Sequence, residues 1–387
     1  MQSHYDLIIV GGGLVGAGLA VALRDTDLKI ALVDARIPDC NDPRLFALNA
    51  GSCQFLENIN IWSQLAEYAC PIHQVHVSHQ GHFGAVRMRC EDVKLQSLGH
   101  VIPARYIEAA LNDALISLKN CDLYRPAILK KLHQENEKAE LIISTESGEK
   151  ILESKLVIGA DGTESTVRKE LNIATERFDY GQSAIVTRTT LKRSHHHIAY
   201  ERFNGKGAIA MLPLIDDECA TIWSGENAMI SELMSLSDND FLSKLQKEFG
   251  YRLGRLESIQ KRHVFPLTMV RAEKAIAGCV YLLGNSAHTL HPIAAQGFNL
   301  ALYEVATLVQ GIKDKTDLQT IWKKTQKRQA GSIGVSHRLS QLFMDDSLAK
   351  NLVAQVGMLG LDIASPIKKK FLQGMLGRSG EIPDLLL

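Results

Sequence analysis

Glycines near the start of the chain have a spacing that suits dinucleotide binding. Gly11, Gly13 and Gly16 form the pattern GxGxxG. The first makes a tight turn, the second lets the backbone approach a pyrophosphate, and the third lets a helix pack closely on a strand. YDLIIV before them is typical of a buried parallel strand, and GLAVAL after them of a buried helix. This order of elements predicts a site in which phosphates meet the N-terminus of a helix.

The end of the second predicted strand supplies an acid. In KIALVDAR, residues 29–36, Asp34 ends the apolar run. It follows the glycines by about 20 residues, where a carboxylate accepts hydrogen bonds from ribose hydroxyls. These residues predict a nucleotide site but leave open whether the nucleotide is FAD or NAD(P).

A second motif, GADG at residues 159–162, ends another predicted strand. That strand follows a predicted hairpin turn at residues 146–150, and Asp161 and Gly162 open a polar loop that continues to Arg168. A simple dehydrogenase has no such loop. We therefore interpret it as an additional part of the nucleotide site.

The third segment is GNSAHTLHPIAAQGFNLAL, residues 284–302, in which a loop leads into an apolar run that predicts a buried helix. His288 and His291 are spaced like a metal pair, and residues 195–197 are consecutive histidines. Neither group has cysteine or carboxylate partners at ligand spacing. We predict no metal, and interpret the pair as loop residues beside a cofactor and the triplet as a solvated turn.

Together these motifs resemble those of the class A flavoprotein aromatic hydroxylases, the family of para-hydroxybenzoate hydroxylase. The resemblance covers nearly the whole chain. The family pattern GDAAHxxxPxxGQG corresponds to residues 284–297, where Asn285 replaces the acid and Ala295 replaces a glycine. Residues 42–62 and 284–302 are similar in particular to the ubiquinone-biosynthesis branch of the family.

The family resemblance implies that the cofactor is FAD, with NAD(P)H as a transient reductant. Asn285 keeps the ability to hydrogen bond a ribityl hydroxyl but lacks the charge of the acid. A helix that begins near Phe298 would direct unpaired N–H groups at the flavin edge where negative charge collects on reduction. The FAD-binding residues that the resemblance implies are Gly11, Gly13, Leu14, Val15, Gly16, Asp34, Arg44, Arg105, Asp161, Gly162, Asn285, Pro292, Gln296, Gly297, Phe298 and Asn299.

The resemblance also implies an α/β fold, a Rossmann-type FAD-binding domain with an inserted mixed β-sheet substrate domain and a helical C-terminus. The FAD-binding domain is expected to be discontinuous, over residues 1–70, 98–180 and 270–330. The substrate domain is expected at residues 71–97 and 181–269, with strands in AIVTRTTL, HIAYERF, GAIAMLPL, CATIWSG and RHVFPLTMV. Residues 331–387 are expected to be helical.

The activity that the resemblance implies is hydroxylation of the aromatic ring of a polyprenylated phenol in ubiquinone biosynthesis, with O₂ activated as a flavin C4a-hydroperoxide. The cofactor does the difficult chemistry, so no catalytic acid or base is assigned. The protein is expected to supply a dry pocket between the inserted sheet and the flavin. The wall of this pocket is predicted to include Met211, Pro213, Leu214 and Phe265.

Composition narrows the other classes of function. Lys plus Arg and Asp plus Glu both number 43, and this zero net charge does not favour nucleic acid as a partner. The 7 cysteines contain no CxxC pair, which indicates reduced thiols and disfavours a disulfide reductase. The first apolar run is too short for a signal peptide, and no run reaches the ~18 residues of a membrane span. We expect a cytoplasmic protein, peripheral at the inner face of the membrane.

A segment near the C-terminus offers a way to reach a membrane-bound substrate. IKKKFLQGMLGR, residues 367–378, follows the helix-breaking pair Ser365 and Pro366. The sequence predicts either an interfacial helix that contacts a membrane surface or other ubiquinone-biosynthesis proteins, or a helix packed on the body of the protein. In the first case Lys368, inside the apolar arc, has to snorkel. The arc consists of Ile367, Phe371, Leu372, Met375 and Leu376.

Two alternative functions stay open on the sequence. A prenyl reductase of the same superfamily would also take a long isoprenoid, and a non-catalytic FAD-binding scaffold would retain the nucleotide motifs. A flavin-dependent halogenase is disfavoured because Trp62, Trp223 and Trp322 are isolated and do not form WxWxIP. Oxygen-dependent consumption of NAD(P)H with a phenol distinguishes the hydroxylase.

Overall fold

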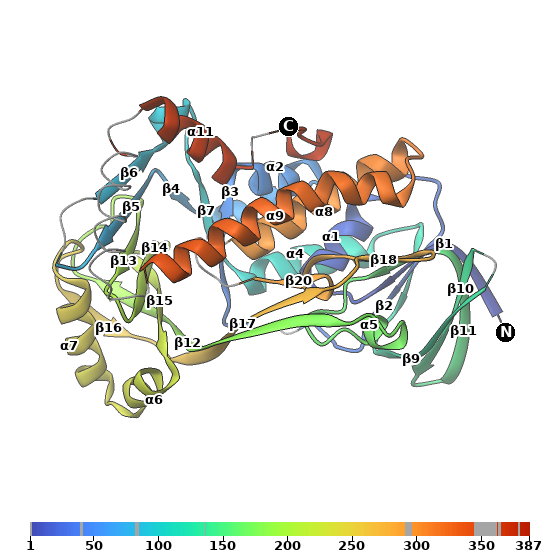
Figure 1. The fold of residues 1–387 in the computed structure, drawn as a ribbon, viewed down its shortest axis with the longest axis horizontal. Coiled ribbons are helices and arrows are strands. Elements are labelled where there is room, and N and C mark those ends of the chain that lie inside the picture. The colour runs from blue at the N-terminus through green and yellow to red at the C-terminus, as the bar shows by residue number, and fades with distance from the viewer. Residues whose placement is uncertain are drawn as a thin grey trace.

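The computed structural model describes residues 2–38, 42–81, 85–135, 137–290, 296–343, 362, 365–377 and 380–387 (Figure 1). A large sheet lies at each end of the molecule, and two long paired strands, β12 (Thr175–Leu191) and β17 (His263–Ala272), extend between them. Helices and strands are interleaved along the chain. The predicted α/β fold class is confirmed.

The first sheet has the parallel arrangement expected of a nucleotide-binding domain. Its parallel strands lie in the order β19, β11, β1, β2 and β8. Every residue of β2 is buried, as expected of a parallel strand that is covered on both faces. The strands are β1 (Gln2–Val10), β2 (Ile30–Val33), β8 (Cys121–Tyr124), β11 (Gly148–Gly159) and β19 (Val280–Leu282), with β18 (Ile276–Ala277) antiparallel at one edge.

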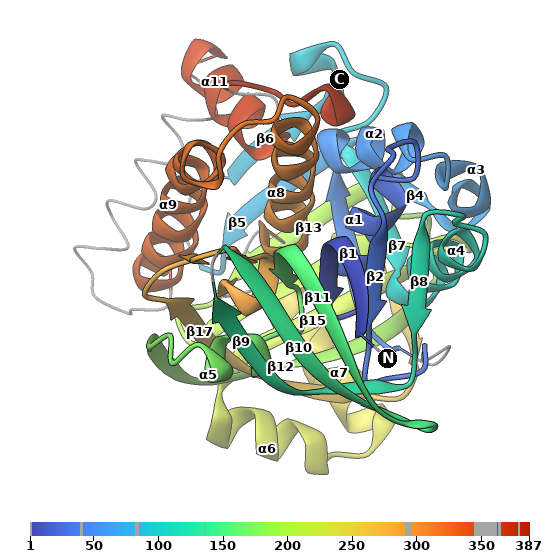
Figure 2. The same cartoon turned by 90° about the vertical axis from the view of Figure 1, so that its right-hand side faces the viewer.

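Helices cover one face of this sheet and a hairpin covers the other. The helices α1 (Leu14–Ala22), α4 (Ala104–Ile116) and α8 (Gln296–Lys313) share a hydrophobic core with β1 and β2 (Figure 2). On the opposite face, β9 (Ala127–Glu135) and β10 (Lys138–Thr145) pack against the sheet. β10 pairs with β11 across the predicted hairpin turn, which is therefore confirmed.

The second sheet contains the strands predicted for the substrate domain. Its order is β20, β17, β12, β15, β14, β13, β5 and β6, with β16 beside β12. All five predicted substrate-domain strands are present. Besides β12 and β17, this sheet contains β5 (Gln74–His79), β6 (Ala85–Arg89), β13 (Ile198–Phe203), β14 (Gly207–Pro213), β15 (Glu218–Glu226), β16 (Leu256–Ile259) and β20 (His288–Thr289).

Two helices cover the outer face of the second sheet. The helices α6 (Asn227–Ser235) and α7 (Asp238–Phe249) share a hydrophobic core with Met211 and Trp223. The inner face of the sheet is left to face the rest of the protein. The division into FAD-binding and substrate domains at the predicted residue numbers stays a prediction.

A small third sheet connects the two large ones. The antiparallel strands β3 (Leu45–Asn49), β7 (Gly99–Pro103) and β4 (Cys70–Ile72) form it. The helices α2 (Ala50–Asn58) and α3 (Trp62–Leu65) follow β3 and pack into the core of the first sheet.

The C-terminal helices pack on the body of the protein. α9 (Leu318–Phe343) lies along α8, and α11 (Ser365–Met375) lies above the small third sheet (Figure 1). Leu372 and Leu376 are 3% and 4% exposed and share a core with Ile72 and Met88. The apolar arc therefore packs intramolecularly at Leu372 and Leu376, with Phe371 partly buried against the same core, whereas the side chain of Ile367 lies outside the described residues.

Polar contacts hold α11 in place at both ends. Near its start, Lys368 Nζ lies 3.5 Å from Asp92 Oδ2 and donates a hydrogen bond to the carbonyl of Arg87. At its end, Asn49 Nδ2 donates to the carbonyl of Met375, and the backbone N–H of Gly51 donates to the carbonyl of Leu376. Lys368 thus pairs with an acid rather than snorkelling. Within the described ranges, no helix is long and apolar enough to cross a membrane.

The packing of α11 predicts that Leu372 contributes to stability. Replacement of Leu372 by Ala should lower the free energy of unfolding by about 2 to 3 kcal/mol, because it removes buried methyl groups and leaves a cavity. Gln373, exposed on the same helix, provides the control Gln373→Ala, which should leave stability unchanged within about 0.5 kcal/mol. Urea denaturation measures both variants. If Leu372→Ala is as stable as the control, α11 does not pack on the body of the protein in solution.

Candidate functional site

The GxGxxG turn is constrained by close backbone contacts. A Cβ on Gly16 would lie 1.9 Å from the carbonyl oxygen of Gly11, and one on Gly11 would lie 2.3 Å from that of Ala160. Gly11 also has a φ of 107°, which side chains rarely adopt. Gly13 differs, because the nearest atom to its Cβ would be a guanidinium nitrogen of Arg36 at 3.9 Å. Two of the glycines are therefore needed by the protein itself, whereas Gly13 leaves room for another group.

Asp34 is held at the end of β2 by an arginine that sequence reasoning missed. Arg125 is buried, and its Nη2 lies 3.5 Å from Asp34 Oδ2 and donates to the carbonyl of Gly12. The other carboxylate oxygen of Asp34 accepts from the N–H of Arg36. Asp34 is thus fixed beside the glycine turn, as the fingerprint predicts. Nothing in the motif itself points to Arg125, which lies far along the chain.

The GADG motif lies beside the first turn. Asp161 Oδ2 accepts from the N–H of Val167, at the start of α5 (Thr166–Glu170). Its Oδ1 is buried and has no hydrogen-bond partner among the described residues. A buried carboxylate oxygen is costly to leave unpaired, so this atom favours a bound group that donates a hydrogen bond.

Arg168 joins the second motif to the third. It is 4% exposed, and its guanidinium donates to the carbonyls of Thr163 at 2.6 Å and Ser286 at 2.8 Å. Burial lowers the pKa of Arg168, against the attraction of nearby acids. The polar loop that the sequence shows after Gly162 is therefore fixed to the turn at residues 284–286.

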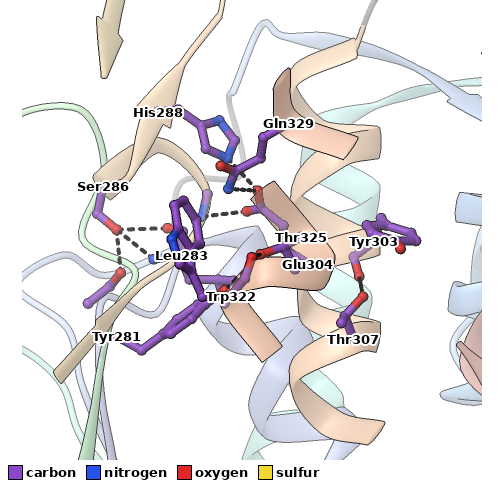
Figure 3. A network of polar contacts seen from close by, with 12 residues as sticks. Tyr281, Leu283, Ser286, His288, Tyr303, Glu304, Thr307, Trp322, Thr325 and Gln329 are labelled. Carbon is purple, nitrogen blue, oxygen red and sulfur yellow. Dashed lines mark hydrogen bonds and ion pairs between the residues drawn. The ribbon is translucent and has the colours of Figure 1, made fainter. Parts of the chain in front are cut away.

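The third motif is organised around the buried acid Glu304 on α8 (Figure 3). Glu304 is 1% exposed and accepts hydrogen bonds from the N–H of Gly284 at 3.1 Å and from Gln329 Nε2 at 2.5 Å. His288 Nε2 lies 2.5 Å from Glu304 Oε1. The interpretation of His288 as a loop residue is wrong, because it lies in strand β20 and is 3% exposed within a buried polar network. Its position beside the cofactor stays a prediction.

The N-terminus of α8 faces the space between the two large sheets. The side chain of Asn299 accepts from the N–H of Asn49 and donates to the carbonyl of Ala47, each at 2.9 Å, which fixes the first turn against β3. Phe298 packs on Phe46, with ring centroids 4.7 Å apart. Among the described residues, a Cβ on Gly297 would meet no atom within 4 Å, so these residues leave space beside the start of the helix. Pro292, His291 and Ala295 lie outside the described residues.

One cavity of about 1160 Å³ joins all three motifs. It runs from the glycine turn past the start of α8 to the inner face of the second sheet. The predicted FAD-binding residues that line it are Gly11, Gly13, Leu14, Val15, Asp34, Arg44, Asp161, Gly162, Asn285, Gln296, Gly297, Phe298 and Asn299.

The two arginines predicted to bind the cofactor differ in their position relative to the cavity. Arg44 lines the cavity and forms an ion pair with Asp42, at 2.6 Å between Arg44 Nη2 and Asp42 Oδ2. Burial opposes ionisation of Asp42, but the hydrogen bonds and charge of Arg44 keep the pKa of its carboxyl below its usual value. Arg105 does not line the cavity; its guanidinium lies 4.6 Å from the centre of the Tyr106 ring. Gly16 also lies outside the lining, beneath the turn.

The far end of the cavity is apolar, and its wall differs from the predicted one. None of Met211, Pro213, Leu214 and Phe265 lines it. Met211 points to the outer face of the sheet, into the core with α6 and α7. Side chains alternate along β14, so its inner face presents the neighbours Ala210 and Leu212 instead. The other wall residues are Ile72, Val75, Val77, Val86, Met88, Leu98, Ala199, Tyr200, Glu201, Phe203, Ile222, Phe371, Leu372, Met375 and Leu376.

Residues 196 and 197 of the histidine triplet form the predicted turn and His196 is exposed, but His195 is buried rather than solvated. His195 is 4% exposed, and ligand atoms of Cys70, His195 and His197 lie within 4.8 Å of one another. Both ring nitrogens of His195 are engaged, Nε2 with the carbonyl of Leu214 and Nδ1 with the N–H of His197. Burial raises the pKa of Cys70 to about 11, which favours the thiol over the metal-binding thiolate. These contacts do not favour a metal here, and its absence stays a prediction.

The site as a whole fits FAD. The glycine turn and the unpaired oxygen of Asp161 suit the nucleotide, the open space at Gly297 suits a ring system, and the cavity is large and largely preformed. The residues would hold FAD through the glycine turn, Asp34, Asp161 and Asn285. These individual contacts with FAD stay a prediction.

The glycine turn, the GADG motif and the N-terminus of α8 surround one cavity. This combination is typical of an FAD-binding protein. The chain belongs to the FAD binding domain family, whose model matches residues 4–315. FAD is therefore the cofactor.

Relatives with assigned names cover almost the whole chain. The ubiquinone hydroxylase UbiL of Rhodospirillum rubrum is 26% identical over 388 residues, which cover 96% of this chain and 89% of that protein. The 3-demethoxyubiquinol 3-hydroxylase of Escherichia coli is 26% identical over 389 residues, which cover 96% and 98%. The crystal structure of the p-nitrophenol 4-monooxygenase PnpA from Pseudomonas putida has a TM-score of 0.79 at 14% identity and covers 98% of this chain and all of that one. This last likeness shows a shared fold.

The geometry of the turn separates two roles of glycine. Gly13→Ala should fold normally, because its Cβ has space, but should weaken FAD binding about tenfold or more, because the backbone must approach the pyrophosphate. Gly16→Ala should instead destabilise the FAD-free protein by about 2 to 4 kcal/mol, because its Cβ meets a carbonyl. Fluorescence titration of FAD and urea denaturation of FAD-free protein distinguish the two. Wild-type affinity in folded Gly13→Ala would show that the pyrophosphate does not lie at this turn.

Proposed function

We propose that this protein is an FAD-dependent monooxygenase that hydroxylates the aromatic ring of a polyprenylated phenol in ubiquinone biosynthesis. The proposal includes 2-polyprenyl-6-methoxyphenol as the substrate. Two observations support it. The structure has one continuous cavity with a polar cofactor end and an apolar end, and the relatives include ubiquinone hydroxylases.

The cavity accounts for how the chain would serve this reaction. FAD, when bound, supplies the redox chemistry that takes electrons from NAD(P)H and uses O₂. The protein orients the ring hydroxyl and the reacting carbon against the apolar wall of β13, β14 and β15. The buried side chains of α11 close the cavity on one side and exclude water from it.

The N-terminus of α8 contributes an electrostatic role. The first N–H groups of a helix have no partner within the helix and carry a partial positive charge. Gly297 and Phe298, at the start of α8, line the cavity between its polar and apolar ends. A group that gains negative charge at this place is stabilised by the helix.

The decisive experiment is turnover with a short-chain substrate. Purified protein loaded with FAD should oxidise NADH or NADPH faster when 2-prenyl-6-methoxyphenol is added, and the product should contain one oxygen atom from ¹⁸O₂. A prenyl reductase would instead consume NAD(P)H without O₂ and add hydrogen to the prenyl chain. A non-catalytic scaffold would bind FAD and turn over with no phenol. Either of these two results would contradict the proposed function.

We also propose that the protein takes its substrate at the inner face of the cytoplasmic membrane or from other ubiquinone-biosynthesis proteins. A polyprenyl chain is apolar and partitions into a bilayer. Leu372 and Leu376 of the apolar arc are buried and do not provide the contact in this structure. Cosedimentation with anionic vesicles tests the membrane route: binding that Lys369→Glu and Lys370→Glu together reduce would place the contact on the polar side of α11. Equal recovery with and without vesicles would contradict the membrane route.

A further inference from the structure

The apolar wall of the cavity contains one acid, Glu201 on β13. Because side chains alternate along a strand, Ala199, Glu201 and Phe203 share the face that lines the cavity. The ring of Tyr200, between them, packs toward α7, 5.8 Å from the ring of Phe249, although Tyr200 also contributes to the lining. Glu201 is therefore an inward-facing residue of the second sheet.

The immediate surroundings of Glu201 are apolar. Its partners on the neighbouring strands are Ala210 on β14 and Val77 on β5. Leu212 and Ile222 lie on the same wall. Within the part of the chain that the structure describes, the carboxylate makes no hydrogen bond and no ion pair. A half-buried carboxylate without a partner is costly, which favours a ligand that shares a proton with it.

Apart from Tyr200, whose ring packs against Phe249 of α7, the other ionisable residues that line the cavity lie elsewhere in it. The segment after β2 contains Asp34 and Arg36, and the residue directly before β3 is Arg44. The GADG motif contributes Asp161. Glu164 pairs with Arg177. No histidine or lysine is among the described residues of the lining. Glu201 is thus the acid that stands alone on the wall formed by the second sheet.

We propose that Glu201 is the base that accepts the proton of the ring hydroxyl when the phenol is bound. The proposal rests on the proposed function. The O–H bond of the phenol breaks, the proton bonds to a carboxylate oxygen of Glu201, and the electron pair stays on the phenol oxygen. This raises the electron density of the ring carbons ortho and para to it, which are then better nucleophiles. The carboxylic acid afterwards returns the proton to the oxygen of the product.

The environment of Glu201 suits this transfer. Burial raises the pKa of Glu201 from 4.5 to about 7. A phenol has a pKa of about 10, so a carboxylate in water is too weak a base by five to six orders of magnitude. The raised pKa reduces this difference to about three orders, and a base with a pKa near the working pH is the most effective general base.

The test compares Glu201→Gln with two matched variants. Glu201→Asp keeps the carboxylate, and Glu257→Gln makes the same chemical change at an exposed position of β16. Glu201→Gln should bind 2-prenyl-6-methoxyphenol within about threefold of wild type but lower kcat by about 10²-fold or more, the usual contribution of a general base. Its profile of kcat/KM against pH should lose the rising limb near pH 7, and Glu201→Asp should restore the limb. Glu257→Gln should match wild type.

A stability measurement reports on the carboxyl group without turnover. Because the pKa of Glu201 is raised in the folded protein, its contribution to stability is fully present below pH 4.5 and is lost as the pH rises through about 7. The stability of wild type relative to Glu201→Gln should fall over this window, whereas that of wild type relative to Glu257→Gln should not.

The outcomes separate this proposal from the proposed function. A wild-type protein that hydroxylates no phenol overturns the proposed function, and the base role with it. A wild-type protein that hydroxylates the phenol, together with a Glu201→Gln variant of equal kcat and unchanged pH profile, overturns the base role alone.

Discussion

The buried carboxylate of Glu304 is the interaction on which the arrangement of the site depends. A carboxylate that is removed from water is costly unless several groups pair with it. Glu304 meets this requirement with the backbone of Gly284, the imidazole of His288 and the amide of Gln329. These groups belong to the turn that holds Asn285, to strand β20 and to helix α9. One side chain of α8 therefore holds that helix against the turn at residues 284–286.

The other contacts of the site extend from this network. Arg168 ties the turn at residues 284–286 to the GADG loop, and Asn299 ties the start of α8 to β3. Asn49, at the end of β3, in turn holds the last turn of α11. The cofactor motifs and the apolar wall of the cavity are thus linked through hydrogen bonds between side chains and backbone groups. This continuity explains how motifs far apart in the chain line one cavity of defined shape.

The sequence predicted the cofactor end of the site better than the substrate end. GxGxxG, GADG and the segment at residues 284–302 have backbone requirements that only certain residues satisfy, so their positions are visible in the letters. The wall of the cavity has no such requirement. In β14 every residue is apolar, so the alternation of side chains does not reveal which face is inward. The sequence therefore predicted Met211 as a wall residue, whereas Ala210 and Leu212 line the cavity.

Two acids of the site lie outside the three motifs but can be noticed in the sequence by their apolar neighbours. Glu304 is an acid within a mainly apolar stretch of α8, which indicates a buried partner. In β13, Glu201 stands at every second position with the apolar residues Ala199 and Phe203, which indicates that it shares their face of the strand. Their partners come from other elements, and only the folded chain brings them together. The same holds for Arg125 and for the packing of α11, whose apolar arc suits a membrane surface and a protein core equally well.

We propose that one cavity holds FAD at its polar end and the phenol ring against the inner face of the second sheet. A crystal structure of the protein with FAD and 2-prenyl-6-methoxyphenol bound tests this arrangement. We expect the flavin ring beside Gly297 and the ring hydroxyl within hydrogen-bond distance of Glu201. A phenol bound outside the wall formed by β13, β14 and β15, or a flavin ring placed away from the start of α8, would contradict it.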